Sequence, residues 1–497
     1  MNRFLGSRSL LPVKPRSFAP KSLRLQLSKL SPCAAFSVAL GLSVCAMTAA
    51  EPNWQAQRGE LLRHYQAILQ IDSSDPPGNE APVVEYLKKV LEADGIPVKI
   101  FSLDPKRPNL VARLKGNGSK KPLLIMAHTD TVGVQADKWK HPPFGAVREG
   151  GYIYGRGTID DKDNVATGLM VMLLAKRLNV PLDRDLIFLA ESGEEGSVRY
   201  GIKYMVENHW DEIDAEFCIA EGGGVVRKGG KLHRMTVATT EKIPFAVKLV
   251  ATGPAGHGSR PLLNNAVVKL SQAVSKAAAW QTPMRLNDTT RTYFERLATV
   301  SSPEEAARYN GLVNPEKTEE IQSYFAANEP GHYSMLRTSI TPTILSAGFR
   351  VNVIPSQAEA TLDIRALPDE DMPKFLEQLR GIINDSQVEV QRIARDTRPG
   401  ATPSSLDTEM FKAIEAGQKK HYPGAITLPT MSTGATDKAY LQARGMQCYG
   451  IGPMTDEEDA ALGYGAHSDQ ERIVEEALYT FLEFHWDIVM AVSAAGR

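Results

Sequence analysis

Two residues able to bind a metal ion, His128 and Asp130, directly follow the apolar run Leu123–Ala127. The run is typical of a buried strand, and side chains two positions apart on an extended chain point the same way. An imidazole and a carboxylate together suit zinc, manganese or cobalt. Taken alone, such a pair is more often just a hydrogen-bonded strand end, so the metal hypothesis depends on the rest of the chain.

Further carboxylates that could bind a metal ion lie in expected turns and at the ends of expected strands. Asp160 lies in a polar, glycine-rich turn, and Glu194 and Glu195 follow the strand candidate Leu186–Ala190. Adjacent buried carboxylates repel each other unless a cation is present, so this pair fits a metal ligand beside a catalytic base. Glu221 ends the next strand candidate, before three glycines. The alternative for each of these residues is an ordinary solvated turn.

Two histidines complete the set of candidates. His467 lies directly before the last expected helix, and His257 lies in a glycine-rich loop of the middle region. The alternative for His467 is an exposed side chain near a helix start, and for His257 an ordinary loop residue.

The elements that must position these residues alternate between helix and strand in the first half of the chain. The apolar spacing predicts helices over residues 54–69, 80–93, 164–178 and 198–209, and strands over 98–103, 109–114, 123–127, 186–190 and 217–220. This alternation predicts an α/β fold with a mixed sheet and helices on both faces. In such sheets, ligands bind beyond the carboxyl ends of the strands, where the candidate residues lie.

The pattern changes at residue 243. Strand, helix, strand, strand, helix and strand are predicted over 243–252, 264–280, 343–349, 358–365, 371–383 and 388–393, which is the ferredoxin-like order. We therefore predict an inserted α+β lid or dimerisation domain over 243–395, with a polar, partly helical excursion at 281–341. Residues 51–242 and 396–497 would form the two parts of the catalytic domain, and the last segment, with a helix over 472–490, would return to the first part.

The first fifty residues differ in composition from the rest. They contain seven basic and no acidic residues, followed by an apolar run from Cys33 to Ala46 and then small residues. This pattern predicts a secretory signal over 1–50 and a secreted or periplasmic protein. The apolar run is shorter than the ~20 residues that a membrane span needs, although an anchor, or lipidation at Cys45, is the alternative.

The remaining chain is mildly acidic. Removing the seven basic residues from the 57 of the chain leaves 50, against 58 acidic residues. A net negative charge gives no electrostatic reason to bind nucleic acid or anionic lipid. Cys218 and Cys448 lie in apolar runs, and two cysteines indicate buried thiols rather than a disulfide framework.

The combined motifs resemble the M20 family of metallopeptidases, which includes glutamate carboxypeptidases, aminoacylases, carnosinase-type dipeptidases and succinyl-diaminopimelate desuccinylase. The resemblance covers roughly residues 55–490. It rests on motifs in family order, namely His128-Thr-Asp130, Gly155-Arg-Gly-Thr-Ile-Asp160-Asp161-Lys162, Glu194-Glu195-Gly196, Glu221, Gly256-His257-Gly258 and Ala466-His467-Ser468.

The resemblance implies two divalent metal ions. Asp160 would bridge them, His128 and Glu221 would hold one ion, and Glu195 and His467 would hold the other. Zinc is the expected ion, with cobalt or manganese as alternatives. The ligand set would carry a charge of −3 against +4, which suits a water bridging the two ions.

The resemblance also implies roles for residues that do not bind metal. Glu194 would be the general base that activates this water, Asp130 would orient His128, and His257 would bind the developing oxyanion. Asp161 resembles the residue that follows the bridging aspartate through a cis peptide bond. In the family, the histidine of the lid often comes from a partner subunit, so a homodimer through the inserted domain is expected.

Four residues are predicted to contact substrate. Arg365 would pair with a substrate carboxylate, and Asn352 lies in a segment that resembles a substrate-contacting element of the family. A surface ion pair is the alternative for Arg365. Gly434 and Thr436 belong to a stretch that resembles the Gly-Gly-Thr-Asp loop of the family, from which Ala435 departs.

These observations predict a metal-dependent hydrolase that cleaves an amide or peptide bond in dipeptides or short peptides with a free carboxylate. The nearest alternative is deacylation of N-acyl amino acids, as in aminoacylases and desuccinylases. A remote alternative is a non-catalytic binding protein with the same fold. A purely structural zinc site is disfavoured, because such sites are closed and often contain cysteine.

Overall fold

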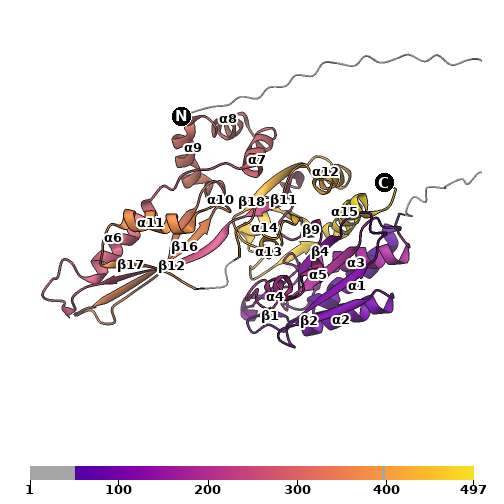
Figure 1. Ribbon diagram of the computed structural model, residues 1–497, viewed down its shortest axis with the longest axis horizontal. Coiled ribbons are helices and arrows are strands. Elements are labelled where there is room, and N and C mark those ends of the chain that lie inside the picture. The colour runs from indigo at the N-terminus through magenta and orange to yellow at the C-terminus, as the bar shows by residue number, and fades with distance from the viewer. Residues whose placement is uncertain (1–50, 395–397, 497) are drawn as a thin grey trace, which may run out of the picture. The chain divides into compact units, whose positions relative to one another are not determined.

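The computed structural model describes residues 51–394 and 398–496, and its largest feature is a ten-stranded mixed sheet (Figure 1). The strands lie in the order β2-β3-β8-β4-β9-β19-β11-β10-β20, with β18 paired to β11. Their bounds are β2 Val98–Ser102, β3 Pro108–Leu114, β4 Leu123–His128, β8 Leu186–Glu191, β9 Phe217–Ala220, β10 Gly224–Lys228, β11 Lys231–Glu241, β18 Ile426–Ser432, β19 Gln447–Gly450 and β20 Met454–Asp456. Strands β8, β4, β9 and β19 run parallel to their neighbours in this series.

The central strands are buried on both faces because their sequences are almost entirely apolar. Successive side chains alternate between the faces, so Leu124 and Ile187 join one core while Ile125 and Phe188 join the other. The strands β10, β11, β18 and β20 carry more polar residues, and the sequence pattern did not predict them.

Helices cover both faces of this sheet, as predicted. One core includes α1 Trp54–Leu69, α2 Ala81–Ala93, α3 Lys162–Arg177, α12 Glu409–His421 and α15 Glu475–Ser493. The other face is covered by α4 Ile202–Asn208, α5 Trp210–Ile213 and α13 Lys438–Gln442. Contacts between α3 and α15 bring residues 162–177 and 475–493 together, and Figure 1 shows their magenta and yellow ribbons side by side.

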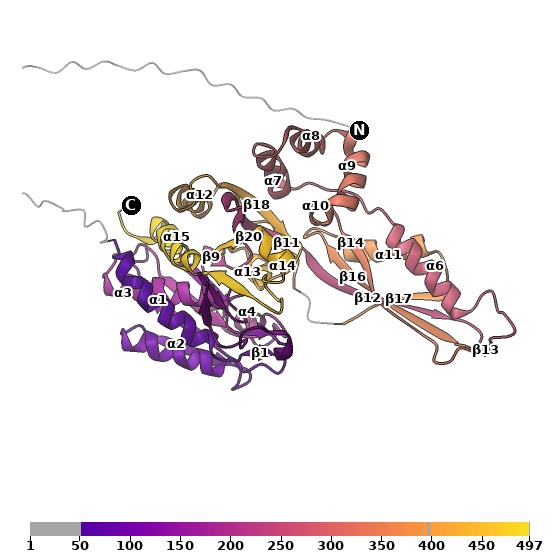
Figure 2. The same ribbon diagram turned by 180° about the vertical axis from the view of Figure 1, so that it is seen from behind.

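Residues 243–394 contain a second, separate sheet with its own core. Its four antiparallel strands lie in the order β14-β16-β12-β17, with helices α6 and α11 in contact beside it (Figure 2). The bounds are β12 Ile243–Thr252, α6 Ala266–Ala279, β14 Ser339–Ala347, β16 Gln357–Ala366, α11 Met372–Ile383 and β17 Val388–Arg392. The sequence of elements is the predicted β-α-β-β-α-β order.

The segment between α6 and β14 is more ordered than its polar sequence suggested. It forms α7 Asp288–Ala298, α8 Pro303–Gly311, α9 Pro315–Asn328 and α10 Pro330–Met335. Phe294, Tyr309 and Phe325 form a small core that also includes Leu428 and Met431 of β18. The excursion therefore packs on the first sheet.

The remaining elements are short. They are β1 Ser74–Asp75 with β5 Thr131–Val132, β13 Gly256–His257 with β15 Val353–Ile354, the sheet of β6 Val147–Glu149, β7 Tyr152–Tyr154 and β21 Arg472–Val474, the 3-10 helix Ala136–Lys138, and α14 Glu457–Leu462. The predicted single helix over 472–490 is wrong at its start, because residues 472–474 pair with β7 and α15 begins at Glu475. None of the described helices is long and apolar enough to cross a membrane. The predicted secretory signal lies outside the described residues.

Candidate metal centre

The predicted ligands lie where the central parallel strands end. His128 is the last residue of β4, Glu221 directly follows β9, and Glu194 and Glu195 lie in the turn after β8. Because β8, β4 and β9 are neighbours and run in the same direction, these residues share one edge of the sheet. Ligand sites of α/β sheets are found at this edge.

The ring of His128 is buried and held on one side. Its Nδ1 lies 3.1 Å from the main-chain oxygen of Asp130 and 3.4 Å from the carboxylate of the same residue. A hydrogen bond from Nδ1 leaves the lone pair of Nε2 free to bind a metal. Nε2 points to Asp160, whose Oδ1 is 3.1 Å away.

Asp160 connects the two histidines through separate oxygens. Its Oδ2 lies 3.0 Å from Nε2 of His467, and the same nitrogen lies 3.0 Å from Oε1 of Glu195. Two ligand atoms that each lie about 2.0–2.2 Å from a zinc ion are roughly 3–3.5 Å apart when the angle between them is near that of a tetrahedron. The spacing therefore fits atoms that share an ion.

Two overlapping groups of side chains that contain His128 meet the distance requirement for metal binding. The ligand atoms of His128, Asp160 and Glu195 all lie within 4.8 Å of one another, and so do those of His128, Glu194 and Glu221. Each group combines an imidazole with carboxylates, which suits zinc, cobalt or manganese.

The charges of the site also favour cations. Burial and the charge of Asp160 together raise the pKa of Glu221 to about 7. Burial likewise raises the pKa of Glu194 well above its ordinary value, although Arg398 opposes this shift. Hydrogen bonds to Asp160 and Glu195 raise the pKa of His467 to about 10. These raised pKa values reflect an excess of buried negative charge. Divalent cations neutralise the same negative charge when they bind. The residues present fit a pair of metal ions.

Asp130 links His128 to the acidic turn. Its Oδ1 accepts hydrogen bonds from the main-chain N–H groups of Gly193 and Glu194, at 3.0 and 3.3 Å, and its Oδ2 accepts one from Glu195 at 3.0 Å. One buried carboxylate therefore contacts both the ring of His128 and the backbone that carries the two glutamates.

The peptide bond between Asp160 and Asp161 is cis, as the resemblance implied. The carboxylate of Asp161 accepts a hydrogen bond from the main-chain N–H of His128, at 3.1 Å, and another from the side chain of Asn164. Asp161 thus contacts the backbone of one ligand and directly follows another.

Arg398 is a residue of the site that the sequence did not reveal. Its guanidinium donates to the main-chain oxygen of Glu194 at 3.0 Å, contacts the carboxylate of Glu194, and donates to Asp437 at 3.2 Å. The sequence analysis gave this arginine no role, because no motif or apolar pattern surrounds it. Lys438 was also unassigned, and its ammonium group donates to the main-chain oxygen of Glu221 at 3.0 Å.

Of the predicted substrate contacts, Thr436 lies beside the site. Its N–H and hydroxyl both bind the carboxylate of Glu241, at 2.8 Å, and its neighbour Asp437 pairs with Arg398. Gly434 is exposed, and its N–H donates to the hydroxyl of Ser432.

The other predicted contacts lie in the block that contains the second sheet. Arg365 pairs with Asp363, at 3.1 Å. Asn352 accepts a hydrogen bond from Gly258 through its main-chain oxygen. His257 is exposed, and its ring accepts from Ser259. Within residues 51–394 and 398–496, the contacts recorded for these side chains do not reach the metal-ligand group.

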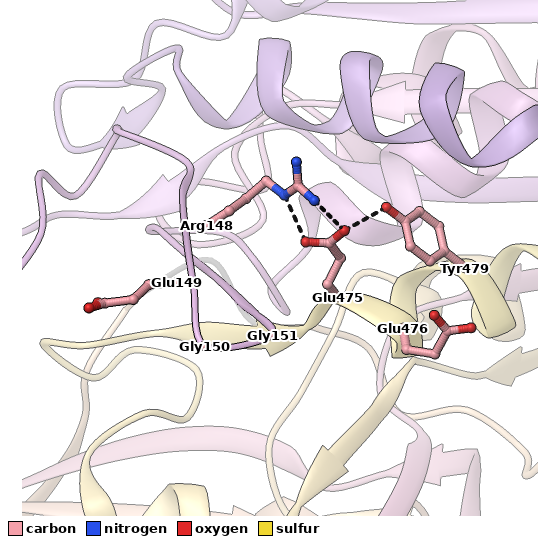
Figure 3. Close-up of a pocket in the computed structure, with 7 residues that line it drawn as sticks. All are labelled: Arg148, Glu149, Gly150, Gly151, Glu475, Glu476 and Tyr479. Atoms are coloured by element: carbon pink, nitrogen blue, oxygen red, sulfur yellow. Dashed lines mark hydrogen bonds and ion pairs between the residues drawn. The ribbon is translucent and has the colours of Figure 1, made fainter.

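A surface hollow between the β6–β7 hairpin and the start of α15 does not contain these ligands (Figure 3). Arg148 binds Glu475 through two hydrogen bonds of 2.7 Å, and the hydroxyl of Tyr479 donates to the same carboxylate at 2.9 Å. Glu476 pairs with Arg58. Because these charged groups satisfy one another, we assign no ligand to this hollow.

Comparison with known proteins agrees with the geometry. The sequence model of peptidase family M20/M25/M40 matches residues 124–491. The chain is 27% identical over 390 residues to a probable carboxypeptidase S-like 2 of Dictyostelium discoideum, covering 77% of this chain and 74% of that protein. It is 28% identical over 382 residues to the N-fatty-acyl-amino acid synthase/hydrolase PM20D1 of Homo sapiens, covering 75% and 74%.

A solved structure shows the same fold. The M20 family metallo-carboxypeptidase Sso-CP2 from Sulfolobus solfataricus has a TM-score of 0.68 and 20% sequence identity, over 87% of this chain and 99% of that one. The family match includes all the residues that converge at the edge of the first sheet. The chain belongs to peptidase family M20/M25/M40.

Proposed function

We propose that this family member hydrolyses the amide or peptide bond of dipeptides or short peptides with a free carboxylate. The observation that carries the proposal is the meeting of His128, Asp160, Glu195 and His467 at 3.0–3.1 Å. The neighbouring Glu194 makes no contact with His467 or Asp160 among the recorded bonds of the described residues and so remains available as a base.

Two divalent ions, with zinc as the proposed metal, would polarise the scissile carbonyl and favour loss of a proton from water when bound. His128, Asp160 and Glu221 would hold one ion, and Asp160, Glu195 and His467 the other. The donor set of two imidazoles and three carboxylates supports this assignment.

Glu194 is the proposed general base. Its carboxylate takes a proton from the attacking water as the new C–O bond forms, and returns a proton to the nitrogen as the C–N bond breaks. Arg398 contacts this carboxylate and Asp130 binds the N–H of the same residue, so the base is held from two sides. This restraint is what efficient proton transfer over a short distance requires.

Deacylation of an N-acyl amino acid is the second candidate reaction. The likeness to the PM20D1 hydrolase supports it, as the likeness to the carboxypeptidase S-like protein supports peptide cleavage. Both reactions use the same base and the same metal ligands. Side-by-side assays on a dipeptide panel and an N-acyl amino acid panel separate them by the ratio of kcat/KM.

We also propose a homodimer through the second sheet. β14 is an edge strand that pairs with β16 alone among the described strands. Ile344 and Leu345 on this strand are 60% and 67% exposed, and Phe349 beyond it is 85% exposed. An exposed apolar edge is a template for pairing with another strand, and a second copy provides a matching one. His257 would then act as an oxyanion donor to the site of the partner subunit.

The test of the proposed activity uses the purified chain without its first fifty residues, which we propose to be removed on export. We expect hydrolysis of at least one dipeptide or N-acyl amino acid, loss of turnover with a chelator, and recovery with zinc, cobalt or manganese. Metal analysis should give two ions per chain. A folded protein that binds no divalent ion and shows no turnover would reject the proposal and favour a non-catalytic binding protein. Equal turnover with and without a divalent ion would reject the metal-dependent mechanism.

A further inference from the structure

Two of the segments that carry metal ligands come from distant parts of the chain. Asp160 lies near the end of the loop between β7 and α3, and His467 lies in the turn before β21. The side chain of His467 is 53% exposed and its backbone adopts a left-handed conformation, with φ of +63°. A non-glycine residue rarely adopts this conformation without support from its surroundings. The position of His467 therefore depends on what anchors its turn.

Glu471 is the residue that joins this turn to the Asp160 loop. Its side chain is fully buried. Its Oε2 accepts hydrogen bonds from Arg156 at 2.6 Å and from the N–H of Gly157 at 3.1 Å. Its Oε1 accepts from the N–H of Ile159 at 2.9 Å and from the hydroxyl of Thr158 at 3.3 Å. One carboxylate thus binds the four residues that directly precede Asp160.

The connection is reinforced in both directions. The second arm of Arg156 donates to the main-chain oxygen of Ser468, at 2.9 Å, directly after His467. The main-chain oxygen of Glu471 accepts from the N–H of Gly155, at 3.1 Å. These hydrogen bonds connect the two loops directly. The two charged side chains that take part, Arg156 and Glu471, are both buried.

We propose that Glu471 is a positioning residue that sets the distance between Asp160 and His467 and thereby determines how tightly the ion between them is held. The inference rests on the proposed metal centre. Glu471 would not bind the ion itself, and it would act by holding two ligands from different segments at the 3.0 Å separation observed.

A glutamine at position 471 cannot reproduce the arrangement. All four groups that face the carboxylate donate hydrogen bonds, and an amide nitrogen is itself a donor. Whichever way the amide is turned, its nitrogen meets a main-chain N–H, either that of Gly157 or that of Ile159. Glu471→Gln therefore opens at least one contact to the loop. Loss of a group that orients metal ligands typically lowers metal affinity about 10–100-fold.

The experiment measures zinc binding to the wild-type chain and to variants by titration against a competing chelator. Glu471→Gln should weaken one of the two binding steps about 10–100-fold, and it should be the step that His467→Ala weakens. Added zinc should restore turnover in Glu471→Gln because the ligands themselves remain. The matched control is Glu475→Gln, which removes a similar pair with Arg148 four residues later (Figure 3). This control should leave both steps unchanged.

Arg156→Lys provides a second, milder variant. It keeps a cation beside Glu471 but loses the bond to Ser468, so a smaller loss in the same binding step is expected. Circular dichroism establishes that each variant is folded. A folded Glu471→Gln or Arg156→Lys chain with wild-type affinity in both steps would overturn the inference, as would an equal loss in Glu475→Gln. If the wild-type chain itself binds none of zinc, cobalt or manganese, the proposed function fails instead.

Discussion

The neighbouring glutamates 194 and 195 allow the metal-ligand and base assignments to be tested with matched substitutions. The carboxylate of Glu195 lies 3.0 Å from Nε2 of His467, whereas that of Glu194 contacts Arg398. Glu194→Gln should abolish most turnover and leave both ions bound. Glu195→Gln should release an ion, with activity falling as a consequence.

The expected sizes follow from what each change removes. Glu194→Gln keeps the shape of the side chain but removes the base, and general acid–base catalysis contributes about 10²–10⁴-fold, or roughly 3–5 kcal/mol of activation free energy. The metal ligands are untouched. Glu195→Gln removes one of three ligand carboxylates and lowers the negative charge of the donor set by one, so its main effect is on metal affinity.

The assay combines steady-state kinetics on a cleaved dipeptide with metal analysis of the same preparations. For Glu194→Gln, kcat should fall while the metal content stays at two ions per chain and added zinc does not help. For Glu195→Gln, excess zinc should recover part of the activity. The reasoning is refuted if Glu194→Gln loses metal while Glu195→Gln retains it, because the two roles would then be reversed.

Three further predictions test other parts of the structure. Asp130→Asn leaves one main-chain donor of the acidic turn unpaired, so unfolding in urea should show a loss of about 1–3 kcal/mol, and zinc affinity should fall with it; unchanged values for both would contradict its orienting role. Leu345→Asp should convert a dimer into a folded monomer, which light scattering after gel filtration measures, and a dimer that persists would place the interface elsewhere. Burial lowers the pKa of His485 to about 3, so the folded state resists protonation and stability should fall as the pH drops below the ordinary value of ~6.5. The wild-type chain should lose about 1.6 kcal/mol between pH 6.5 and 5 relative to His485→Gln, and an equal pH dependence of the two unfolding free energies would disprove this.

Strands of the first sheet were predictable where an apolar sequence coincides with burial in the folded protein. The strand ending at His128 is apolar throughout because it is buried on both faces, and the bounds of β4 and β9 follow the pattern within a residue. The proposed metal ligands could be named because their motifs resemble those of the M20 family, whereas the local pattern alone left each residue with an ordinary alternative.

The apolar pattern of the sequence did not predict strands whose formation depends on their pairing partners rather than on their own composition. β11 includes Lys231, His233 and Arg234, and it becomes a strand because β10, β18 and β19 all pair with it. Residues 472–474 read as the start of a helix because only the distant β7 makes them a strand. Arg398 was missed for the same reason, since nothing near it in sequence indicates the carboxylate it contacts.

The position of β19 in the sheet has a consequence for how the chain folds during synthesis. β19 lies between β9 and β11, yet a ribosome makes it long after both of them. Until it emerges, the nascent chain exposes an unpaired apolar edge at β9, which invites association with other chains. Glu221 stands at the end of that strand, and His467 emerges later still. The last residue of the proposed metal site is therefore synthesised only after β19, the strand that pairs with β9 and β11.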